Sequence, residues 1–427
     1  MNIISNPQRS EWDALLRRPV FDSQSLESVV LPVLQAVKER GDEALLEFTA
    51  RFDKVTLTRM EVTPAEMNAA EDLLSDDLKA AIIQAKQNIH LFHSVQLQAA
   101  ETVETMPGVT CWRKSVGIQT VGLYIPGGSA PLFSTVLMLG IPAAIAGCKE
   151  IILTTPPDKE GRIHPAILFA AQQAGITRIF KVGGAQAIAA MAYGTESIPA
   201  VCKIFGPGNQ YVTCAKQLVQ RAGVAIDMPA GPSEVCVLAD ATANPDYIAA
   251  DLLSQAEHGP DSQVLLVTTA AKLAPEVIKA VEAQTLVLSR KQIAEGALQH
   301  SKAIIVKDMQ EAVAIVNAYA PEHLIVCCEN DESVAEKIVN AGSVFLGNYS
   351  PESAGDYASG TNHTLPTNGY ARAYSGVSVD SFVKKITYQK LTRDGLAGIA
   401  PTIIRMAEAE GLDAHANAVR VRMVNGE

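Results

Sequence analysis

The feature that most constrains the fold is an alternation, from residue 120 onwards, of short apolar runs with segments of helical periodicity. The runs are rich in β-branched residues and have the length of buried strands. Such alternation indicates parallel sheets built from right-handed crossovers, and with this many units two α/β lobes are more economical than one sheet. The expected strands are 120–125, 150–154, 178–182, 203–205, 235–238, 263–268, 303–306, 324–327 and 343–346. Expected helices between them include 209–221, 245–257 and 309–319.

The first quarter of the chain is dominated by helical periodicity, over 26–52 and 63–92. The sequence Thr63-Pro64-Ala65-Glu66 predicts a helix start, because it combines a capping box with proline at the first helical position.

Four other segments have distinct patterns. The apolar run 132–148 falls short of a membrane span, so we interpret it as a buried helix. The turn-rich stretch 227–233 is a plausible return point between the lobes. Residues 348–376 are rich in Gly, Ser, Thr, Asn and Pro without a charge run, which is typical of an ordered functional loop. Beyond residue 381 helical periodicity returns, which predicts a small helical unit.

Composition bounds the class of protein. The chain has 427 residues, 48% of them hydrophobic and 19% charged, so it can bury a large core and is long for one domain. Its net charge of −11 argues against a sequence-independent nucleic-acid binder, which needs a basic footprint. Seven cysteines are scattered without a C-x-x-C pair, and Met1–Arg18 contains no signal-peptide apolar region. We therefore expect a cytoplasmic protein with reduced cysteines.

Gln255 and His258 are candidate metal ligands, because residues three positions apart share one helix face. Further candidates lie downstream at Asp356 and His415. Nitrogen and oxygen donors without cysteine suit zinc or a neighbouring divalent metal.

The metal hypothesis has open alternatives. A Gln-x-x-His pair on a helix is more often a polar face than a ligand pair, and His90 and His93 have the same spacing. His363 competes with Asp356 for any metal role in its loop.

Glu322 and His323 are the clearest acid/base pair, at the start of the strand expected over 324–327. Histidine titrates near neutrality, and burial raises a glutamate toward that range, so the two can divide proton transfers. The alternative is a solvent-exposed loop pair.

Three glycine-rich turns follow expected strands and lead into helices, at 126–129, 183–186 and 206–209. Helix N-terminal amides there could receive a phosphate or another anion. None of the turns is the full G-x-G-x-x-G fingerprint, and glycine after a strand also simply makes a tight turn.

Taken together, seven motifs in register closely resemble the histidinol dehydrogenase family, from about residue 25 to the C-terminus. They are VGLYIPGG (121–128), VGGAQA (182–187), FGPGN (205–209), IDMPAGPSE (226–234), LLSQAEHGPDS (252–262), PEHL (321–324) and GDYASGTNH (355–363). The resemblance implies oxidation of L-histidinol to L-histidine in two successive NAD-dependent steps through a bound aldehyde, the last reactions of histidine biosynthesis.

The resemblance also implies site residues and cofactors, namely NAD and one zinc ion per subunit. The implied zinc ligands are Gln255, His258, Asp356 and His415, and the implied acid/base residues are Glu322 and His323. The implied substrate contacts are Ser233, Gln255, His258, His323, Asp356, Glu410 and His415. The implied dinucleotide contacts are Tyr124, Gln186 and Asn209.

With this resemblance we expect two related, incomplete Rossmann-like lobes with parallel sheets. The expected domains are an N-terminal helical arm (1–22), a discontinuous first lobe (23–125 and 235–376), a second lobe (126–234) and a C-terminal helical unit (377–427). The resemblance implies a homodimer in which the C-terminal unit of one subunit completes its partner's site, so that Glu410 and His415 act across the interface.

Two other functions compete with a dehydrogenase. A two-lobed binding protein would use the same cleft without turnover, and a zinc hydrolase would use Glu322 to activate water without a nucleotide. Only a dehydrogenase that acts on histidinol reduces NAD.

Overall fold

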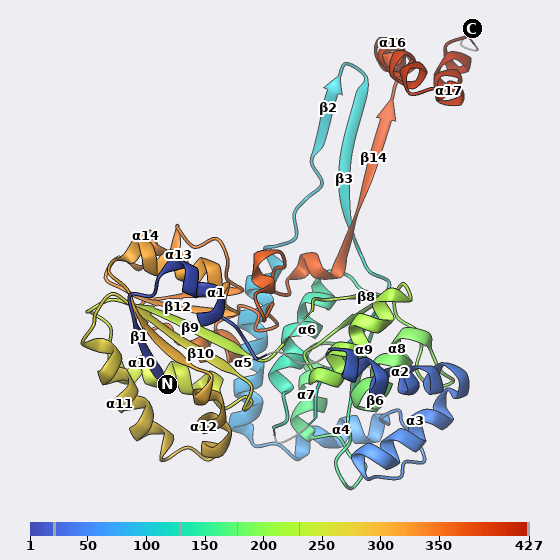
Figure 1. Ribbon diagram of the computed structural model, residues 1–427. Coiled ribbons are helices and arrows are strands. Elements are labelled where there is room, and N and C mark those ends of the chain that lie inside the picture. Colours follow the sequence, from blue (N-terminus) through green and yellow to red (C-terminus); the bar gives the residue numbers. More distant parts are fainter. Residues whose placement is uncertain (20–22, 128–129, 177, 230, 425–427) are drawn as a thin grey trace. The chain divides into compact units, whose positions relative to one another are not determined.

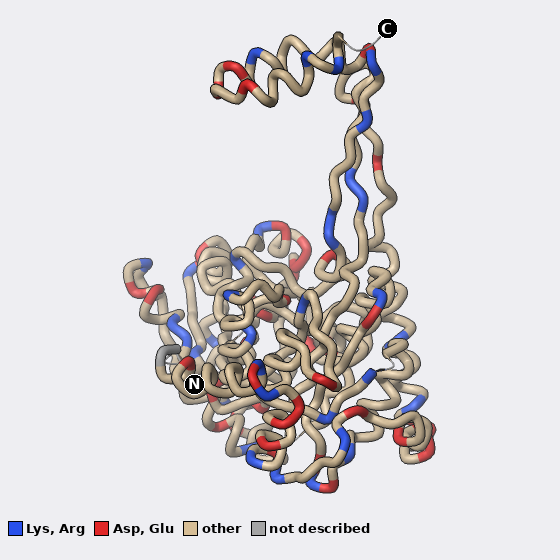
Figure 2. Tube along the Cα trace, turned by 90° about the vertical axis from the view of Figure 1, so that its right-hand side faces the viewer, with Lys and Arg blue, Asp and Glu red and all other residues tan. Residues whose placement is uncertain are grey.

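The computed structural model describes residues 1–19, 23–127, 130–176, 178–229 and 231–424. The chain forms two compact units, one of Met1–Gln96 and Ile118–Phe382 and the other of Leu97–Gly117 and Val383–Glu427. In the first unit, Lys and Arg residues are interspersed with Asp and Glu residues along the trace (Figure 2).

Sheet A of the first unit has parallel strands in the order β1-β11-β10-β9-β12-β13 (Figure 1). Its strands are β1 (Asn2–Ser5), β9 (Glu234–Ala239), β10 (Gln263–Thr268), β11 (Lys302–Ile305), β12 (His323–Cys327) and β13 (Ser343–Leu346). Strands β9, β10 and β12 are buried along their whole length, as expected for parallel strands covered on both faces.

Two apolar cores cover the two faces of sheet A. Val235 and Val237 of β9 pack with one group of helices, whereas Cys236 and Leu238 pack with the other, because strand side chains alternate between faces. The first group is α10 (Pro245–Ala256), α11 (Leu273–Thr285) and α12 (Lys291–Gln299). The second group is α1 (Trp12–Leu15), α13 (Met309–Tyr319) and α14 (Asp331–Ala335).

Sheet B, also in the first unit, has parallel strands in the order β6-β5-β4-β7-β8. They are β4 (Thr120–Tyr124), β5 (Glu150–Thr155), β6 (Arg178–Lys181), β7 (Lys203–Phe205) and β8 (Ala225–Ile226). One core contains α2 (Ser23–Arg40), α3 (Asp42–Phe48), α8 (Gly184–Tyr193) and α9 (Gln210–Arg221). Helix α6 (Phe133–Ile145) packs on β4 and β5, and α5 (Asp76–Ser94) and α7 (Pro165–Gln173) pack on α6. The chain order reverses beside β4, which is the switch point of a doubly wound sheet.

Short elements complete the first unit. They are the 3-10 helices η1 (Arg9–Glu11), η3 (Tyr370–Arg372) and η4 (Val379–Phe382), the π-helix η2 (Thr49–Asp53), α4 (Pro64–Asp72) and α15 (Glu352–Tyr357). The segment 348–376 thus has defined structure, as the sequence predicted.

The second unit contains antiparallel sheet C, with strands in the order β14-β3-β2. Trp112 of β3 stacks on its cross-strand partner Tyr388 of β14, with ring centroids 5.3 Å apart. The elements are β2 (Thr102–Met106), β3 (Val109–Gly117), β14 (Val383–Leu391), α16 (Arg393–Ala409) and α17 (Asp413–Val424).

The predicted α/β fold with parallel sheets is confirmed, and each expected strand is present within a residue or two. The capping box at Thr63 is also confirmed, because the Glu66 N–H donates to Thr63 Oγ1 (3.2 Å) and the Thr63 N–H donates to Glu66 Oε2 (2.8 Å). The apolar run 132–148 forms the largely buried helix α6. Across the described ranges, every helix is too short or too polar to traverse a bilayer.

Three expectations differ from the structure. The arm expected to be helical over 1–22 contains α1 but begins with strand β1, which pairs with β11 three hundred residues later. The expected helical unit over 377–427 contains α16 and α17 but also β14, a strand whose exposed residues lack the alternation of a half-buried strand. Residues 23–125 were expected to join 235–376, yet β4 pairs within sheet B and α2 packs on α8 and α9. In each case the difference arises because the segment pairs or packs with a segment that is distant in sequence.

The turn after β7 is tightly packed against β4. Gly206 has φ +127°, and a Cβ built on it would lie 2.0 Å from the backbone oxygen of Tyr124. Only glycine fits this position, because the backbone angle and the contact both exclude a side chain.

Gly206→Ala is therefore expected to lower the free energy of unfolding by about 3 kcal/mol or more, through strain and overpacking together. The measurement is the midpoint of thermal or denaturant unfolding. Gly147→Ala is the matched control, because Gly147 also has a positive φ (+77°) but no atom within 4 Å of the built Cβ. The control is expected to cost about 1 kcal/mol. Equal losses in the two variants would contradict the steric explanation.

Candidate active site

The candidate site lies at the amino ends of β9 and β12. These neighbouring parallel strands pair His323 with Val235. Ser233 and Glu234 therefore lie beside Glu322 and His323, at one edge of sheet A. Helix α10 follows β9 and returns antiparallel to it, so Gln255 at its C-terminal end comes back to the same edge.

A cavity of about 680 Å³ opens at this edge. The residues that line it include Ser233, Gln255, His258, Glu322, His323 and Asp356. Glu322 and His323 are 7% and 3% exposed, so the alternative of a solvent-exposed loop pair is wrong. The structure thus brings together six of the side chains singled out from the sequence.

His323 has different partners for its two ring nitrogens. Nδ1 lies 2.9 Å from the amide nitrogen of Gln255 and 3.2 Å from the backbone oxygen of Glu234. The amide can only donate and the carbonyl can only accept, so Nδ1 bonds to Gln255 when unprotonated and to Glu234 when protonated. Nε2 is buried without a hydrogen-bond partner and lies 3.5 Å from Asp356 Oδ1.

Glu322 is held by the backbone of the neighbouring strand. Its Oε2 accepts a hydrogen bond of 2.8 Å from the Glu234 N–H and lies 3.6 Å from His323 Nδ1. The carboxylate and the imidazole are therefore close enough to influence each other's charge.

Carboxylates dominate the electrostatics around His323. Burial alone lowers the pKa of His323, but Glu322, Glu352 and Asp356 together raise this pKa well above the ordinary value. Burial raises the pKa of Glu352 to about 8. The pKa of Asp356 is lowered, because the nearby histidines outweigh the opposing effect of burial. The raised pKa of His323 indicates that the surrounding carboxylates favour a positive charge at this position.

Two oxygen atoms in the site have the character of metal donors. Gln255 Oε1 and Asp356 Oδ1 are buried without a hydrogen-bond partner, which is costly unless another group satisfies them. His258 also lines the cavity, with Nδ1 3.5 Å from Ser233 Oγ. This donor set fits a divalent cation such as zinc.

The competing histidines are engaged elsewhere. His363 Nδ1 lies 2.9 Å from the backbone oxygen of Asp356, and Nε2 lies 3.0 Å from Thr135 Oγ1, so both ring nitrogens are used. Burial lowers the pKa of His363. His93 is fully buried, with Nδ1 2.8 Å from the Ile89 oxygen, and His90 is exposed. These contacts favour Asp356 as the metal ligand.

The remaining proposed ligand and a substrate contact belong to the second unit. His415 lies in α17, and Glu410 follows α16. Among the described residues, no three His, Cys, Asp or Glu side chains form a cluster that could hold a metal ion. The proposed ligand set differs from such a cluster, because it includes the amide of Gln255 and a histidine of the other unit.

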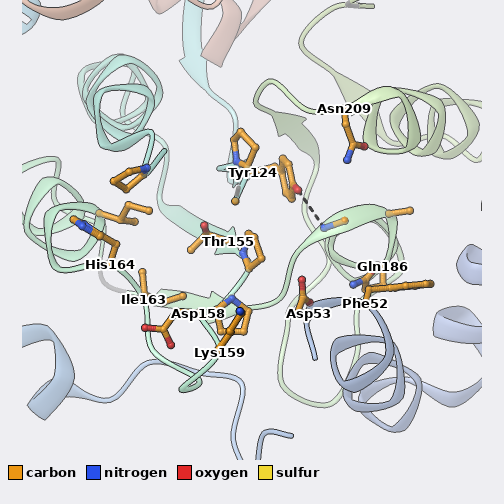
Figure 3. A pocket seen from close by; sticks show the side chains of 18 of the residues that line it. Phe52, Asp53, Tyr124, Thr155, Asp158, Lys159, Ile163, His164, Gln186 and Asn209 are labelled. Atoms are coloured by element: carbon orange, nitrogen blue, oxygen red, sulfur yellow. Dashed lines mark hydrogen bonds between the residues drawn. The ribbon is translucent and has the colours of Figure 1, made fainter. Parts of the chain in front are cut away.

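A second cavity, of about 1180 Å³, lies at the carboxyl ends of the sheet B strands. Tyr124, Gln186 and Asn209 line it from β4, α8 and the turn before α9 (Figure 3). These are the three residues implied as dinucleotide contacts. The cavity therefore lies beside the switch point of sheet B, where ligands bind in doubly wound folds.

Local hydrogen bonds fix these three positions. The Gly184 N–H donates to Tyr124 Oη (3.1 Å), and burial raises the pKa of Tyr124 to about 12 (Figure 3). Asn209 Oδ1 caps α9 by accepting from the N–H groups of Tyr211 and Val212 (3.1 Å each). All three predicted glycine-rich turns thus border the cavity, the first through Pro126 and Gly127, while Gly128 and Ser129 of that turn lie outside the described residues.

The two cavities adjoin, because Pro126 and Asn209 line both. A buried ion pair between Lys216 and Asp227 holds the turn that carries Asn209. Lys216 Nζ donates to the Gly206 oxygen (2.9 Å), and the Gly206 N–H donates to Asp227 Oδ2 (2.8 Å).

Sequence reasoning missed several residues of the site. Glu234 had no assigned role although it ends the motif 226–234, and Arg18, which binds it, lies outside every motif. The large cavity also contains Phe52, Asp53, Asp158, Lys159 and His164 (Figure 3). No local pattern marks these residues, because the packing of distant segments brings them together.

Comparison with known proteins agrees with the motifs. The chain is 63% identical over 423 residues to histidinol dehydrogenase of Bacteroides thetaiotaomicron, with 99% of each chain covered. It is 54% identical over 413 residues to that of Yersinia pestis, which covers 96% of this chain and 92% of the relative. The crystal structure of histidinol dehydrogenase from Elizabethkingia anophelis matches with a TM-score of 0.97 and 57% identity, over 99% of this chain and 98% of that one. The family's sequence model matches residues 16–423, so this chain belongs to the histidinol dehydrogenase family.

Proposed function

We propose that this chain oxidises L-histidinol to L-histidine in two successive NAD-dependent steps, through an aldehyde that stays bound. The family assignment supports the reaction. The observation that carries the assignment of residues is the buried Glu322–His323 pair in a cavity that adjoins a second, dinucleotide-sized one.

His323 is the proposed base for the substrate hydroxyl. The carboxylates that raise the pKa of His323 would be offset by a bound cation, which would leave the ring neutral. A neutral ring with its proton on Nδ1 donates a hydrogen bond to the Glu234 carbonyl and keeps a free lone pair on Nε2. Nε2 has no protein hydrogen-bond partner, so this nitrogen is available to accept the hydroxyl proton as a hydride leaves the same carbon.

Glu322 is the proposed group that activates water for the second oxidation. An aldehyde must gain water before it loses a second hydride, and a carboxylate can take a proton from the attacking water. The resulting hydrate presents a hydroxyl to His323, as the alcohol did. The distance of 3.6 Å between Glu322 Oε2 and His323 Nδ1 supports these two roles, because both groups lie close enough to act on one substrate.

Gln255, His258 and Asp356 are proposed to hold a zinc ion, together with His415. The unpartnered Gln255 Oε1 and Asp356 Oδ1 support this set. When bound, zinc would orient the substrate nitrogens and stabilise negative charge on the reacting oxygen. Ser233, which lies beside His258, is proposed to contact the substrate with the ligands and His323.

NAD is proposed to lie in the larger cavity against Tyr124, Gln186 and Asn209, where two NAD molecules bind in turn and each accepts one hydride. Because the two cavities share Pro126 and Asn209, a dinucleotide in one can reach a substrate in the other. This adjacency supports one substrate position for both oxidations.

We further propose a homodimer in which Glu410 and His415 of one subunit complete the site of the other. The separate small unit that carries these residues supports this arrangement. A cytoplasmic location is proposed as well, because all seven cysteines are free, as in a reducing compartment.

The test of the function is the absorbance of reduced nicotinamide when the purified protein is mixed with NAD and L-histidinol. The expected result is about two equivalents of NADH per substrate, because both oxidations transfer a hydride. A binding protein without turnover or a zinc hydrolase would give no signal, and a yield of one equivalent would refute the second oxidation.

His323→Asn is expected to slow the first hydride transfer by about 100-fold or more, the usual contribution of a general base, while zinc content stays unchanged. Single-turnover NADH absorbance and elemental analysis measure the two quantities. Asp356→Asn is the matched comparison, because it replaces a proposed ligand in the same cavity and is expected to lose zinc. Loss of zinc from the His323 variant would contradict its role as a base.

A subunit-mixing experiment addresses the shared site. His415→Ala and His323→Asn proteins are each expected to be inactive, whereas exchanged hybrids would contain one intact site. Random exchange is expected to restore about a quarter of wild-type activity, because half of the dimers are hybrids with one of two sites intact. Verified exchange without recovery would show that each subunit contains its own complete site.

A further inference from the structure

Glu234, the first residue of β9, connects the candidate catalytic residues to the N-terminal segment. Its buried carboxylate accepts two hydrogen bonds from Arg18, from Nε to Oε1 (2.5 Å) and from Nη2 to Oε2 (2.8 Å). Oε1 also accepts a bond of 2.8 Å from the Asn368 N–H, in the loop that lines the smaller cavity. A bidentate guanidinium–carboxylate pair fixes orientation as well as distance.

The backbone of Glu234 contacts both proposed catalytic side chains. Its N–H donates to Glu322 Oε2 (2.8 Å), and its carbonyl oxygen lies 3.2 Å from His323 Nδ1. A shift of Glu234 would therefore change the position of the carboxylate and the protonated nitrogen of the imidazole together.

Arg18 also holds the turn that leads into Glu322. Nη2 donates to the backbone oxygens of Tyr319 (2.8 Å) and Ala320 (3.4 Å), and the guanidinium lies over the Tyr319 ring, 3.9 Å from its centroid. Ala320 has φ +54°, a left-handed conformation that a residue with a Cβ rarely adopts. Such a conformation persists when surrounding contacts enforce it, and Arg18 supplies two of them.

We propose that Arg18 and Glu234 are a positioning pair for the active site, an inference that rests on the proposed roles of Glu322 and His323. Arg18 touches neither residue and acts on Glu322 from two sides, through Glu234 and through the turn at Ala320. A buried ion pair adds little net stability compared with apolar residues of the same size, because desolvation opposes the attraction. Its directional bonds instead fix the geometry of the groups attached to it, and a misplacement of about 1 Å can slow catalysis about 100-fold.

The test is a double-mutant cycle on the holoenzyme with Arg18→Met and Glu322→Gln, measured as kcat for the alcohol and for the aldehyde supplied as substrate. Arg18→Met keeps an apolar stem of similar length and removes all donors. It is expected to lower kcat for aldehyde oxidation by about 10- to 100-fold, with zinc content and the KM for NAD near wild-type values. In the Glu322→Gln background the same substitution is expected to slow the reaction by a clearly smaller factor, because only the contribution that passes through His323 remains.

Arg178→Met is the matched control. Arg178 also bridges two carboxylates, Glu61 and Glu150, and donates to the Ser197 oxygen, but it lies in β6 and lines neither cavity. Arg178→Met is expected to leave kcat unchanged. The variant therefore measures how far the removal of a bridging arginine affects activity through stability alone.

Conservative variants keep the inference testable if Arg18→Met fails to fold. Arg18→Lys retains the positive charge but cannot form the bidentate pair, so it is expected to recover part of the lost kcat. Glu234→Gln is expected to reproduce the loss. Full additivity of Arg18→Met and Glu322→Gln, or an equal fall in kcat for Arg178→Met, would overturn the positioning role. If Glu322→Gln by itself leaves aldehyde oxidation at full rate, the proposed function of Glu322 fails instead.

Discussion

The parallel pairing of β9 with β12 is the interaction on which the site depends. The register that joins Val235 to His323 places the first residues of both strands at one edge, where the Glu234 backbone meets Glu322 and His323. A shift by one residue would turn these side chains to the opposite face of the sheet. The burial of both strands on both faces makes such a shift costly. The apolar residues that build the core therefore also fix the positions of Glu322 and His323.

The two sheets present opposite ends to their cavities. Sheet B follows the rule for open α/β sheets, since Tyr124 and Asn209 lie beside its switch point at the carboxyl ends of β4 and β7. In sheet A the candidate catalytic residues lie instead at the amino ends of β9 and β12. The shared walls at Pro126 and Asn209 connect the two cavities, which suits a reaction that transfers hydride from a small substrate to a dinucleotide.

Much of the fold could be predicted from sequence, because its strands and helices have strong local signals. The strand runs and the Thr63 capping box depend on neighbouring residues alone, and the structure confirms them. Strands β1 and β14 could not be predicted in this way. The first has four residues and pairs with β11, and the second is largely exposed and pairs with β3, so each depends on a partner about 270 to 300 residues away. The packing of α2 on sheet B has the same cause, because an amphipathic helix does not specify which sheet it covers.

For the site, the sequence alone determined the chemical types and the family, because motifs such as PEHL and SQAEHGPD are contiguous and their order is unmistakable. The motifs alone indicate Gln255, His258, Glu322, His323 and Asp356 as site residues. Only the tertiary structure decided that these side chains share one buried cavity, that Asp356 rather than His363 keeps an unpartnered oxygen, and that Arg18 reaches Glu234. The physical reason is that hydrogen bonds and burial depend on distances between segments far apart in the chain, and those distances exist only once both sheets and their helices have packed.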